Sequence, residues 1–165
     1  MSALSAADWG GFAGAVVAAT AALAGLVFVA VSINLRQILE FPGLPGRAGQ
    51  TLIMFVTPLV VALLVLVPGQ DRAALGWELV VTGLVIVGSQ LLIDRRAGRS
   101  ERETEVSWLL TRLLPVVLGC GCVIAAGIAM LAAGGGGLYW LVPAVLIAIL
   151  SGLVNAWVLL IEIMR

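Results

Sequence analysis

Five long apolar runs with almost no charge restrict what this chain can fold into. They cover roughly residues 10–35, 51–67, 75–93, 108–133 and 138–163. A helix rises about 1.5 Å per residue, so about 20 apolar residues cross the hydrocarbon core of a bilayer. No alternation of polar and apolar residues favours strands instead. The pattern predicts an all-α, polytopic membrane protein, a single domain formed by a bundle of five transmembrane helices.

The composition fits a lipid environment better than an aqueous one. Of the 165 residues, 62% are hydrophobic and 11% are charged, whereas a soluble domain carries about 25% charged residues. Nine arginines balance nine acidic residues, and the net charge of zero gives no indication of nucleic-acid binding. We therefore expect the lipid bilayer to be the main partner. The first run is too long for a signal peptide and lacks a basic segment before it, so we interpret it as a retained span.

Helix-breaking residues mark the connections between the runs. Residues 41–46 contain two prolines and two glycines, which we expect to end the first helix. Residues 68–71 and the four glycines at 134–137 predict short turns. The polar stretch 94–107 contains a plausible helix stop at Gly98 and a capping box formed by Ser100 and Glu103. This stretch predicts a compact helical hairpin.

The arginines lie almost entirely on one side of the predicted bundle. With the amino terminus outside, eight of the nine arginines fall on the cytoplasmic side and only Arg72 falls outside. The positive-inside rule favours this orientation, and an odd number of spans places the carboxyl terminus in the cytoplasm. Aromatic residues are then expected at both membrane surfaces: Trp9, Trp77, Tyr139 and Trp140 outside, Phe41 and Trp108 inside.

Residues that commonly carry catalysis or hold metals are scarce. Histidine is absent, and the only cysteines, Cys120 and Cys122, are spaced so that they point to different faces of a helix. No GxxxxGK loop, no GxSxG turn and no ionisable residue near the middle of a span is present. The sequence therefore predicts neither an enzyme nor an ion-coupled transporter, and it predicts no cofactor and no metal site.

Small residues recur on one face of the first predicted helix and end at a polar mouth. Small residues at such spacings let another helix approach closely, so the face is either a packing seam, within or between protomers, or the lining of a narrow pore. The candidate residues are Gly14, Ala18, Ala21, Gly25, Val29, Ser32 and Arg36.

Two further helices gather polar residues into arcs. Polar side chains are costly in lipid unless paired, so both arcs should face protein or water. They act either as hydrogen-bonding groups between helices or as the lining of a polar cavity, and we expect Gln90 and Asn155 to bond across helices. Glu78 and Glu162 lie near the two membrane surfaces, where snorkelling is cheap. The intramembrane polar candidates are Thr82, Ser89, Gln90, Ser151 and Asn155.

Three segments in the first part of the chain carry a resemblance: GLVFVAVSINL at 25–35, PGLPGRA at 42–48 and LVPGQ at 66–70. On these segments, about the first 70 residues resemble a family of small uncharacterised bacterial multi-pass membrane proteins. It implies a location in the bacterial plasma (inner) membrane, and some similar sequences carry a label as modulators of a membrane protease. Residues 20–35 are also faintly similar to the pore helix of Orai calcium channels. Ile33 or an apolar neighbour replaces the filter glutamate of that family, so this similarity does not imply calcium selectivity.

The sequence thus leads to two hypotheses about function. The first is an oligomeric pore-forming or ion-permeation protein, a homo-oligomer whose first helix lines the pore or lies next to it. The second is a non-conducting membrane scaffold or regulatory subunit, for example of a membrane protease, in which the same residues contact a partner. The sequence identifies no such membrane-protein partner.

Overall fold

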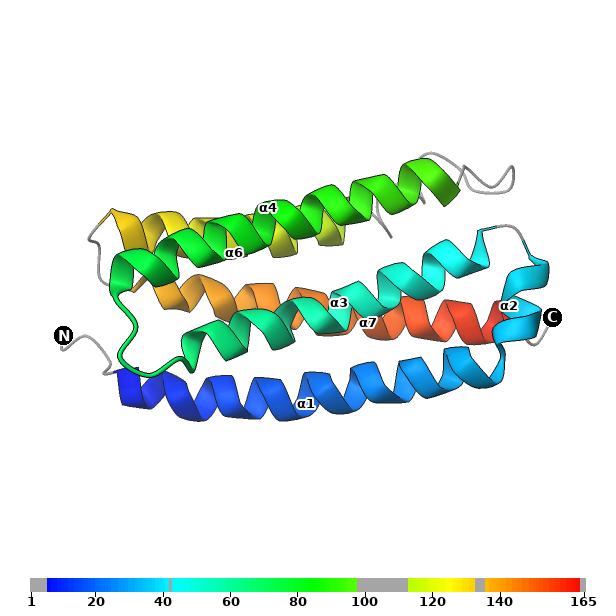
Figure 1. Ribbon diagram of the computed structural model, residues 1–165, viewed down its shortest axis with the longest axis horizontal. Coiled ribbons are helices and arrows are strands. Elements are labelled where there is room, and N and C mark those ends of the chain that lie inside the picture. The colour runs from blue at the N-terminus through cyan, green and yellow to red at the C-terminus, as the bar shows by residue number, and fades with distance from the viewer. Residues whose placement is uncertain (1–5, 42, 98–112, 133–135, 164–165) are drawn as a thin grey trace.

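The computed structural model describes residues 6–41, 43–97, 113–132 and 136–163. Within these ranges all regular structure is helical, and five helices are long and apolar enough to cross a membrane. The predicted all-α class is therefore confirmed, together with five helices of the length and apolar character expected of spans, and Figure 1 shows the long helices aligned along one axis. In chain order the elements are α1 (Ala6–Ile33), α2 (Leu35–Glu40), α3 (Leu44–Val65), α4 (Arg72–Ala97), α6 (Leu114–Leu131), η2 (Gly137–Trp140) and α7 (Leu141–Ile163).

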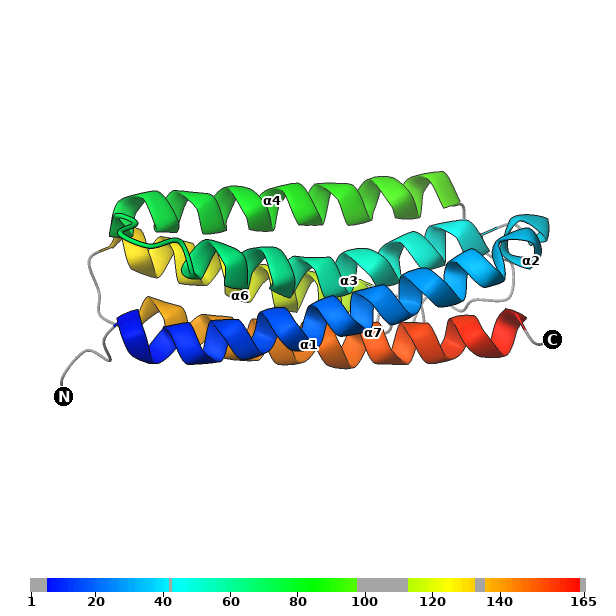
Figure 2. The ribbon, with the colours of Figure 1, turned by 60° about the horizontal axis from the view of Figure 1, so that its bottom comes forward.

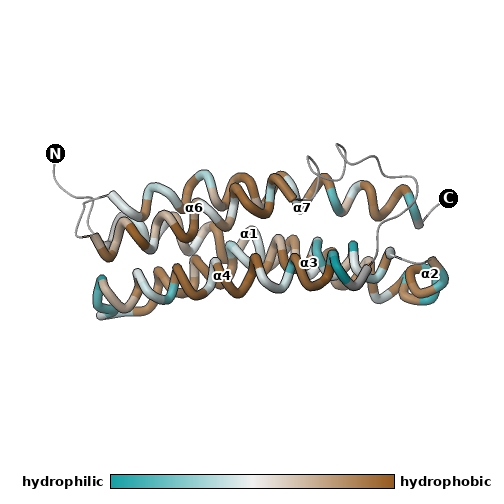
Figure 3. Tube along the Cα trace, turned by 90° about the horizontal axis from the view of Figure 1, so that it is seen from above, coloured by the Kyte–Doolittle hydropathy of each residue, from teal (hydrophilic) through white to brown (hydrophobic). Residues whose placement is uncertain are grey.

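Four of the long helices surround a common core, and the fifth packs on the outside. α3 contacts α4 and α7, and α6 contacts both α4 and α7, so these four helices form a closed ring. α1 packs mainly on α3 (Figures 1 and 2). Neighbouring spans run antiparallel, which places the two chain ends at opposite ends of the bundle. Hydrophilic residues gather mainly toward these two ends, and apolar residues occupy the length between them (Figure 3).

The first span ends earlier than the sequence predicted. α1 stops at Ile33, and the short helix α2 follows after Asn34. The Asn34 side chain donates from Nδ2 to the carbonyl oxygen of Ala30 at 2.9 Å, a local bond of the kind that competes with regular helix. α2 is fixed by Ile38, which is buried against residues of α3 and α7, among them Leu44 and Leu159.

The second span begins at Leu44, seven residues before the predicted start at residue 51. Pro45 and Gly46 belong to the segment 41–46 that we expected to end the first helix, and they lie in the first turn of α3. A proline is tolerated there because the first amide groups of a helix have no partner within it. Helix does end before this segment, at Glu40, and Gly43, whose φ of 93° suits glycine, precedes α3. The start predicted for the second span was therefore seven residues too late.

The third span is longer than predicted, and the last agrees with its predicted limits. α4 runs from Arg72 to Ala97 instead of 75–93, and Asp71 caps its start by accepting a hydrogen bond from the amide of Ala73 at 3.2 Å. α6 covers 114–131, and the limits predicted for its span, 108 and 133, lie outside the described residues. The last span consists of η2 and α7 together, residues 137–163 against the predicted 138–163. Gly98, the Ser100–Glu103 capping box and Trp108 lie outside the described residues.

Glycines bring the helices of the ring close together. A Cβ built on Gly127 of α6 would lie 2.6 Å from the carbonyl oxygen of Gly76 in α4, and one built on Gly83 would lie 2.6 Å from Cγ1 of Ile124. On the other side of the ring, a Cβ on Gly152 would lie 2.7 Å from the ring of Phe55. Lipid provides no hydrophobic driving force between helices, so helices in lipid associate through close packing of this kind. The glycines that pack this bundle are therefore in α4, α6 and α7.

Candidate functional site

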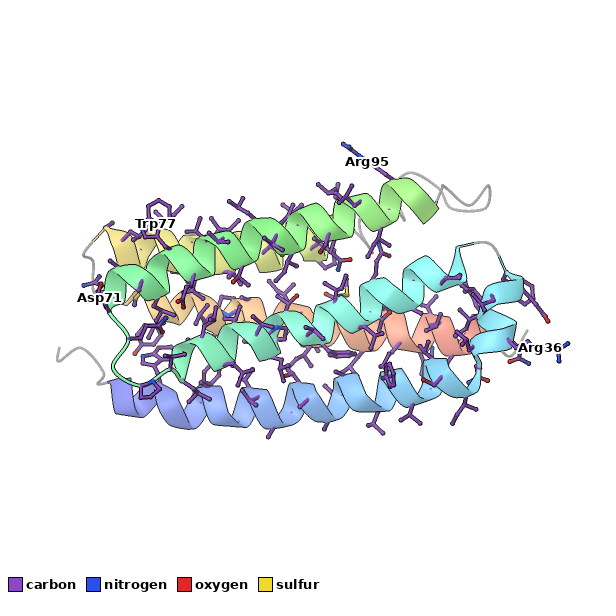
Figure 4. All side chains as sticks on the ribbon, viewed as in Figure 1. Arg36, Asp71, Trp77 and Arg95 are labelled. Atoms are coloured by element: carbon purple, nitrogen blue, oxygen red, sulfur yellow. The ribbon has the colours of Figure 1, made fainter. Side chains whose placement is uncertain are left out.

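Charged residues separate to the two ends of the bundle. Arg36 and Arg95 lie at one end, and Asp71 lies at the other, together with the aromatic residue Trp77 (Figure 4). Arg47 is in the first turn of α3, which starts at the end that holds Arg36. The fold thus gathers at one end arginines that are far apart in the sequence.

The predicted aromatic surface residues divide into two groups. Trp77, Tyr139 and Trp140 are at least half exposed, as expected for residues that meet a membrane surface. Trp9 is buried: its ring lies 5.1 Å from that of Tyr139, in an edge-to-face arrangement that fixes the start of α1. Trp157 in α7, which the sequence reasoning did not single out, is 68% exposed.

The small-residue face of α1 points away from the protomer. All of its predicted members are exposed: Gly14, Ala18, Ala21, Gly25, Val29, Ser32 and Arg36. A Cβ built on Gly14 or Gly25 would meet no atom within 4 Å. The face is therefore not a packing seam within the protomer.

The opposite face of α1 holds the helix to the bundle. Ala13 and Val16 are buried in a cluster with Ala62 of α3 and Val145 of α7. Thr20 is fully buried, and its hydroxyl donates to the carbonyl oxygen of Val16 at 2.7 Å, which satisfies the polar group within its own helix. One side of α1 is thus packed and the side with small residues is open.

A second candidate site is a polar column on α3, formed by Arg47, Gln50, Met54 and Thr57 on successive turns. At its charged end, Nη1 of Arg47 lies 2.7 Å from Oε1 of Glu162 in α7. The two side chains are 18% and 40% exposed, so this ion pair is partly buried. Glu162, which we expected near a membrane surface, therefore has a specific partner in Arg47.

The next two turns of the column also bond to neighbouring helices. Gln50, which is buried, donates from Nε2 to Oδ1 of Asp94 in α4 at 2.6 Å. Asn155 of α7 donates from Nδ2 to the sulfur of Met54 at 3.1 Å. Asn155 thus bonds across helices as expected, with Met54 as its partner, whereas the amide oxygen of Gln90 has no partner among the described residues.

The column ends at a half-open cavity between the four helices of the ring. Thr57, Gln90 and Ser151 line this cavity from α3, α4 and α7. Ser89, the neighbour of Gln90, does not line it, and its hydroxyl donates to the carbonyl oxygen of Ile86 at 2.8 Å. Thr82 is half-buried on the same helix. Two of the five intramembrane polar candidates therefore reach the cavity.

The opposite end of the bundle has its own polar pair. Gln70, in the turn before α4, donates from Nε2 to Oε2 of Glu78. Glu78 and Glu162, the two glutamates expected near the membrane surfaces, thus each have a side-chain partner in the bundle. Among the described residues, no three His, Cys, Asp or Glu side chains lie together in a way that could hold a metal ion.

The sequence reasoning missed the polar column because it placed Arg47 and Gln50 before the start of the second span. Arg47, Gln50, Met54 and Thr57 follow the three- and four-residue spacing of one helix face, and this spacing could have identified the column. Searches against protein-family models, curated proteins and solved structures find no match to the chain.

Proposed function

We propose that this protein is a homo-oligomeric permeation protein of the bacterial plasma membrane, with α1 lining the pore or lying next to it. The amino terminus lies outside and the carboxyl terminus lies in the cytoplasm. The observation that carries the proposal is the open face of α1, where Gly14, Ala18 and Gly25 are exposed while Ala13 and Val16 on the opposite side are buried.

The extent of burial supports contact between copies along α1. In the apolar stretch of α1 that is long enough to cross a membrane, only 11% is buried within the protomer, against 50% in the corresponding stretch of α3. Other outward faces carry large side chains suited to lipid, such as Leu84 and Val85 of α4. The outward face of α1 also exposes large side chains near its end, such as Leu26 and Phe28, but from Gly14 to Gly25 it carries only glycine and alanine, which allow a second helix backbone to approach closely.

The small-residue face of α1 ends in polar residues, which supports a polar opening to the proposed pore. Ser32 is exposed in the last turn of α1, and the Arg36 side chain, one turn further along in α2, is 95% exposed. Arg36 lies 3.6 Å from Glu40, an exposed pair that leaves the guanidinium in contact with solvent. Several copies around an axis would thus place a ring of arginines at the cytoplasmic opening.

The orientation is supported by the gathering of arginines at one end of the bundle. Cytoplasmic segments carry the excess of arginine in membrane proteins. Arg36 and Arg95 lie at the end that the proposal places in the cytoplasm, and Arg72 starts α4 at the other end (Figure 4).

A specific observation favours the alternative, a non-conducting scaffold or regulatory subunit. From Gly14 to Val29 the predicted face carries no polar side chain. The Ser32 hydroxyl donates to the carbonyl oxygen of Phe28 at 2.8 Å, so it is already satisfied within its own helix. Such a face is suited to a dry contact between helices.

Ion flux through purified protein in liposomes distinguishes the two functions. We expect flux of small ions with the unchanged protein, an altered selectivity with Val29→Asp and a strongly reduced flux with Gly25→Trp. The matched control is Val85→Trp, at a position on α4 that is 64% exposed and outside the proposed contact, and it should leave the flux unchanged.

Two outcomes contradict the permeation proposal. A stable oligomer that conducts none of the ions tested assigns the protein to the scaffold class. A protein that remains a monomer in lipid removes the α1 face as a contact between copies and favours the scaffold or regulatory subunit.

A further inference from the structure

The half-open cavity between the ring helices combines an apolar wall with an unsatisfied polar group. Its wall is built from α3, α4, α6 and α7, and Pro58, Val61, Val123 and Ala144 are among its apolar residues. Its volume is about 30 Å³, which is room for about two water molecules or the end of a larger molecule.

Gln90 supplies the unsatisfied group. Its side chain is 3% exposed, and its Oε1 has no hydrogen-bond partner among the described residues. A buried amide oxygen without a partner is costly in the middle of a membrane bundle, because no bulk water is available to replace the lost bond. The position of Gln90 in the cavity wall means that a molecule inside the cavity can supply the missing donor.

The neighbouring polar groups do not meet this need. The Thr57 hydroxyl donates to the carbonyl oxygen of Ile53 at 2.7 Å, and the amide of Asn155 donates to Met54. Pro58, inside α3, has no N–H and so cannot donate to the carbonyl of Met54 one turn earlier. None of these residues therefore supplies a donor to Oε1 of Gln90, and neither the Ser151 hydroxyl nor the Cys120 thiol in the wall bonds to it.

We propose that this cavity binds the hydroxyl end of a small aliphatic alcohol, with the hydroxyl donating to Oε1 of Gln90 and the carbon chain contacting the apolar wall. A charged ligand is disfavoured because, in the described part of the chain, the cavity lining contains no charged residue. Apart from Thr57, Gln90, Cys120 and Ser151 the wall offers only apolar groups and the Met54 sulfur, which suits a carbon chain better than a cluster of water. This site is independent of the α1 face and of the proposed permeation.

Photolabelling of the full-length protein in phosphatidylcholine vesicles tests the proposal. The probe is a medium-chain primary alkanol that carries a photoreactive diazirine, and its chemical control is the same chain without the hydroxyl. We expect the alkanol to label cavity residues such as Val61, Cys120 and Val123, with the label displaced by unlabelled alkanol. The chain without the hydroxyl should label these positions about five- to tenfold less, as expected for one lost hydrogen bond.

Two variants and a matched control complete the test. Gln90→Leu removes the acceptor and Ala148→Leu fills the cavity, so each should reduce cavity labelling about five- to tenfold. Ser89→Ala changes a neighbour of Gln90 that does not line the cavity and should leave the labelling unchanged. Ala148→Leu keeps the test valid if Gln90→Leu fails to fold.

Three results overturn the proposal. The first is equal labelling of the cavity by the chains with and without the hydroxyl, which indicates an apolar hole. The second is unchanged labelling in well-folded Gln90→Leu. The third is labelling confined to lipid-facing residues such as Val85, which leaves the cavity to water alone.

Discussion

Gly152 of α7 lies against the ring of Phe55 in α3, so closely that a Cβ on Gly152 would be 2.7 Å from ring carbon Cε1. Phe55 is fully buried, and its ring has no free space into which it could move cheaply. We predict that Gly152→Val lowers the free energy of unfolding by about 1–3 kcal/mol through overpacking. The loss should appear as a lower midpoint of thermal unfolding in detergent.

The control for this prediction is Gly121→Ala in α6. A Cβ at Gly121 would meet no atom within 4 Å, so this variant should keep or raise the midpoint. If both variants lowered the midpoint equally, the contact between α3 and α7 would not be as close as described.

The ion pair between Arg47 and Glu162 predicts a difference from the pair between Arg36 and Glu40. The first joins α3 to α7 with side chains 18% and 40% exposed, whereas the second is an exposed pair within α2. We predict that Glu162→Gln lowers the free energy of unfolding by about 1–2 kcal/mol, and that Glu40→Gln changes it by less than about 0.5 kcal/mol. Thermal unfolding of both variants, at low and high salt, checks the prediction.

The reversed pair Arg47→Glu with Glu162→Arg extends this test. It should recover part of the stability lost in Glu162→Gln, because the opposite charges again face each other. A reversed pair less stable than the single variant would show that the surroundings of Arg47, and not its charge partner, determine its contribution.

Replacing either of the two buried glutamines, Gln50 and Gln90, should change the free energy of unfolding, but in opposite directions. Gln50 donates to Asp94, so Gln50→Leu removes a charge-assisted bond and should lower the free energy of unfolding by about 1–3 kcal/mol. Gln90 has an amide oxygen without a partner, so Gln90→Leu in the absence of added alcohol should keep or raise the stability. Unfolding midpoints of the two variants under one condition make the comparison, and a large loss for Gln90→Leu would contradict it.

The number of spans was predictable because length and hydropathy alone determine which segments fit a bilayer. The limits of the spans were less predictable, since they depend on local details. Pro45 and Gly46 are helix breakers in the middle of a helix but acceptable in its first turn, and the sequence pattern alone did not distinguish these positions.

Tertiary contacts explain what the sequence reasoning missed in the candidate site. Small residues mark close helix contacts, and the sequence showed them most clearly in α1. The ring is instead packed by glycines such as Gly76, Gly127 and Gly152, whose role depends on the residue that faces them. Gln90 was identified as a polar candidate, but its missing partner follows from the position of Asn155, which bonds to Met54.

The proposed orientation predicts which positions a membrane-impermeant thiol reagent reaches in intact cells. In a background with Cys120 and Cys122 replaced by alanine, a cysteine at the exposed Ala73, near the start of α4, should react from outside. A cysteine at the exposed Gln37 in α2 should react only after the cells are opened. The reverse pattern would place the arginine-rich end outside and contradict the proposed topology.

The central claim is that the small-residue face of α1 joins copies of this chain, and oxidative cross-linking in native membranes tests it most directly. In the same cysteine-free background, Ala18→Cys is placed on the face and Val85→Cys on the outward face of α4, both at exposed positions. If copies of the chain meet at this face, Ala18→Cys forms a disulfide-linked dimer and Val85→Cys does not. Absence of the dimer at Ala18, or equal cross-linking at both positions, would contradict it.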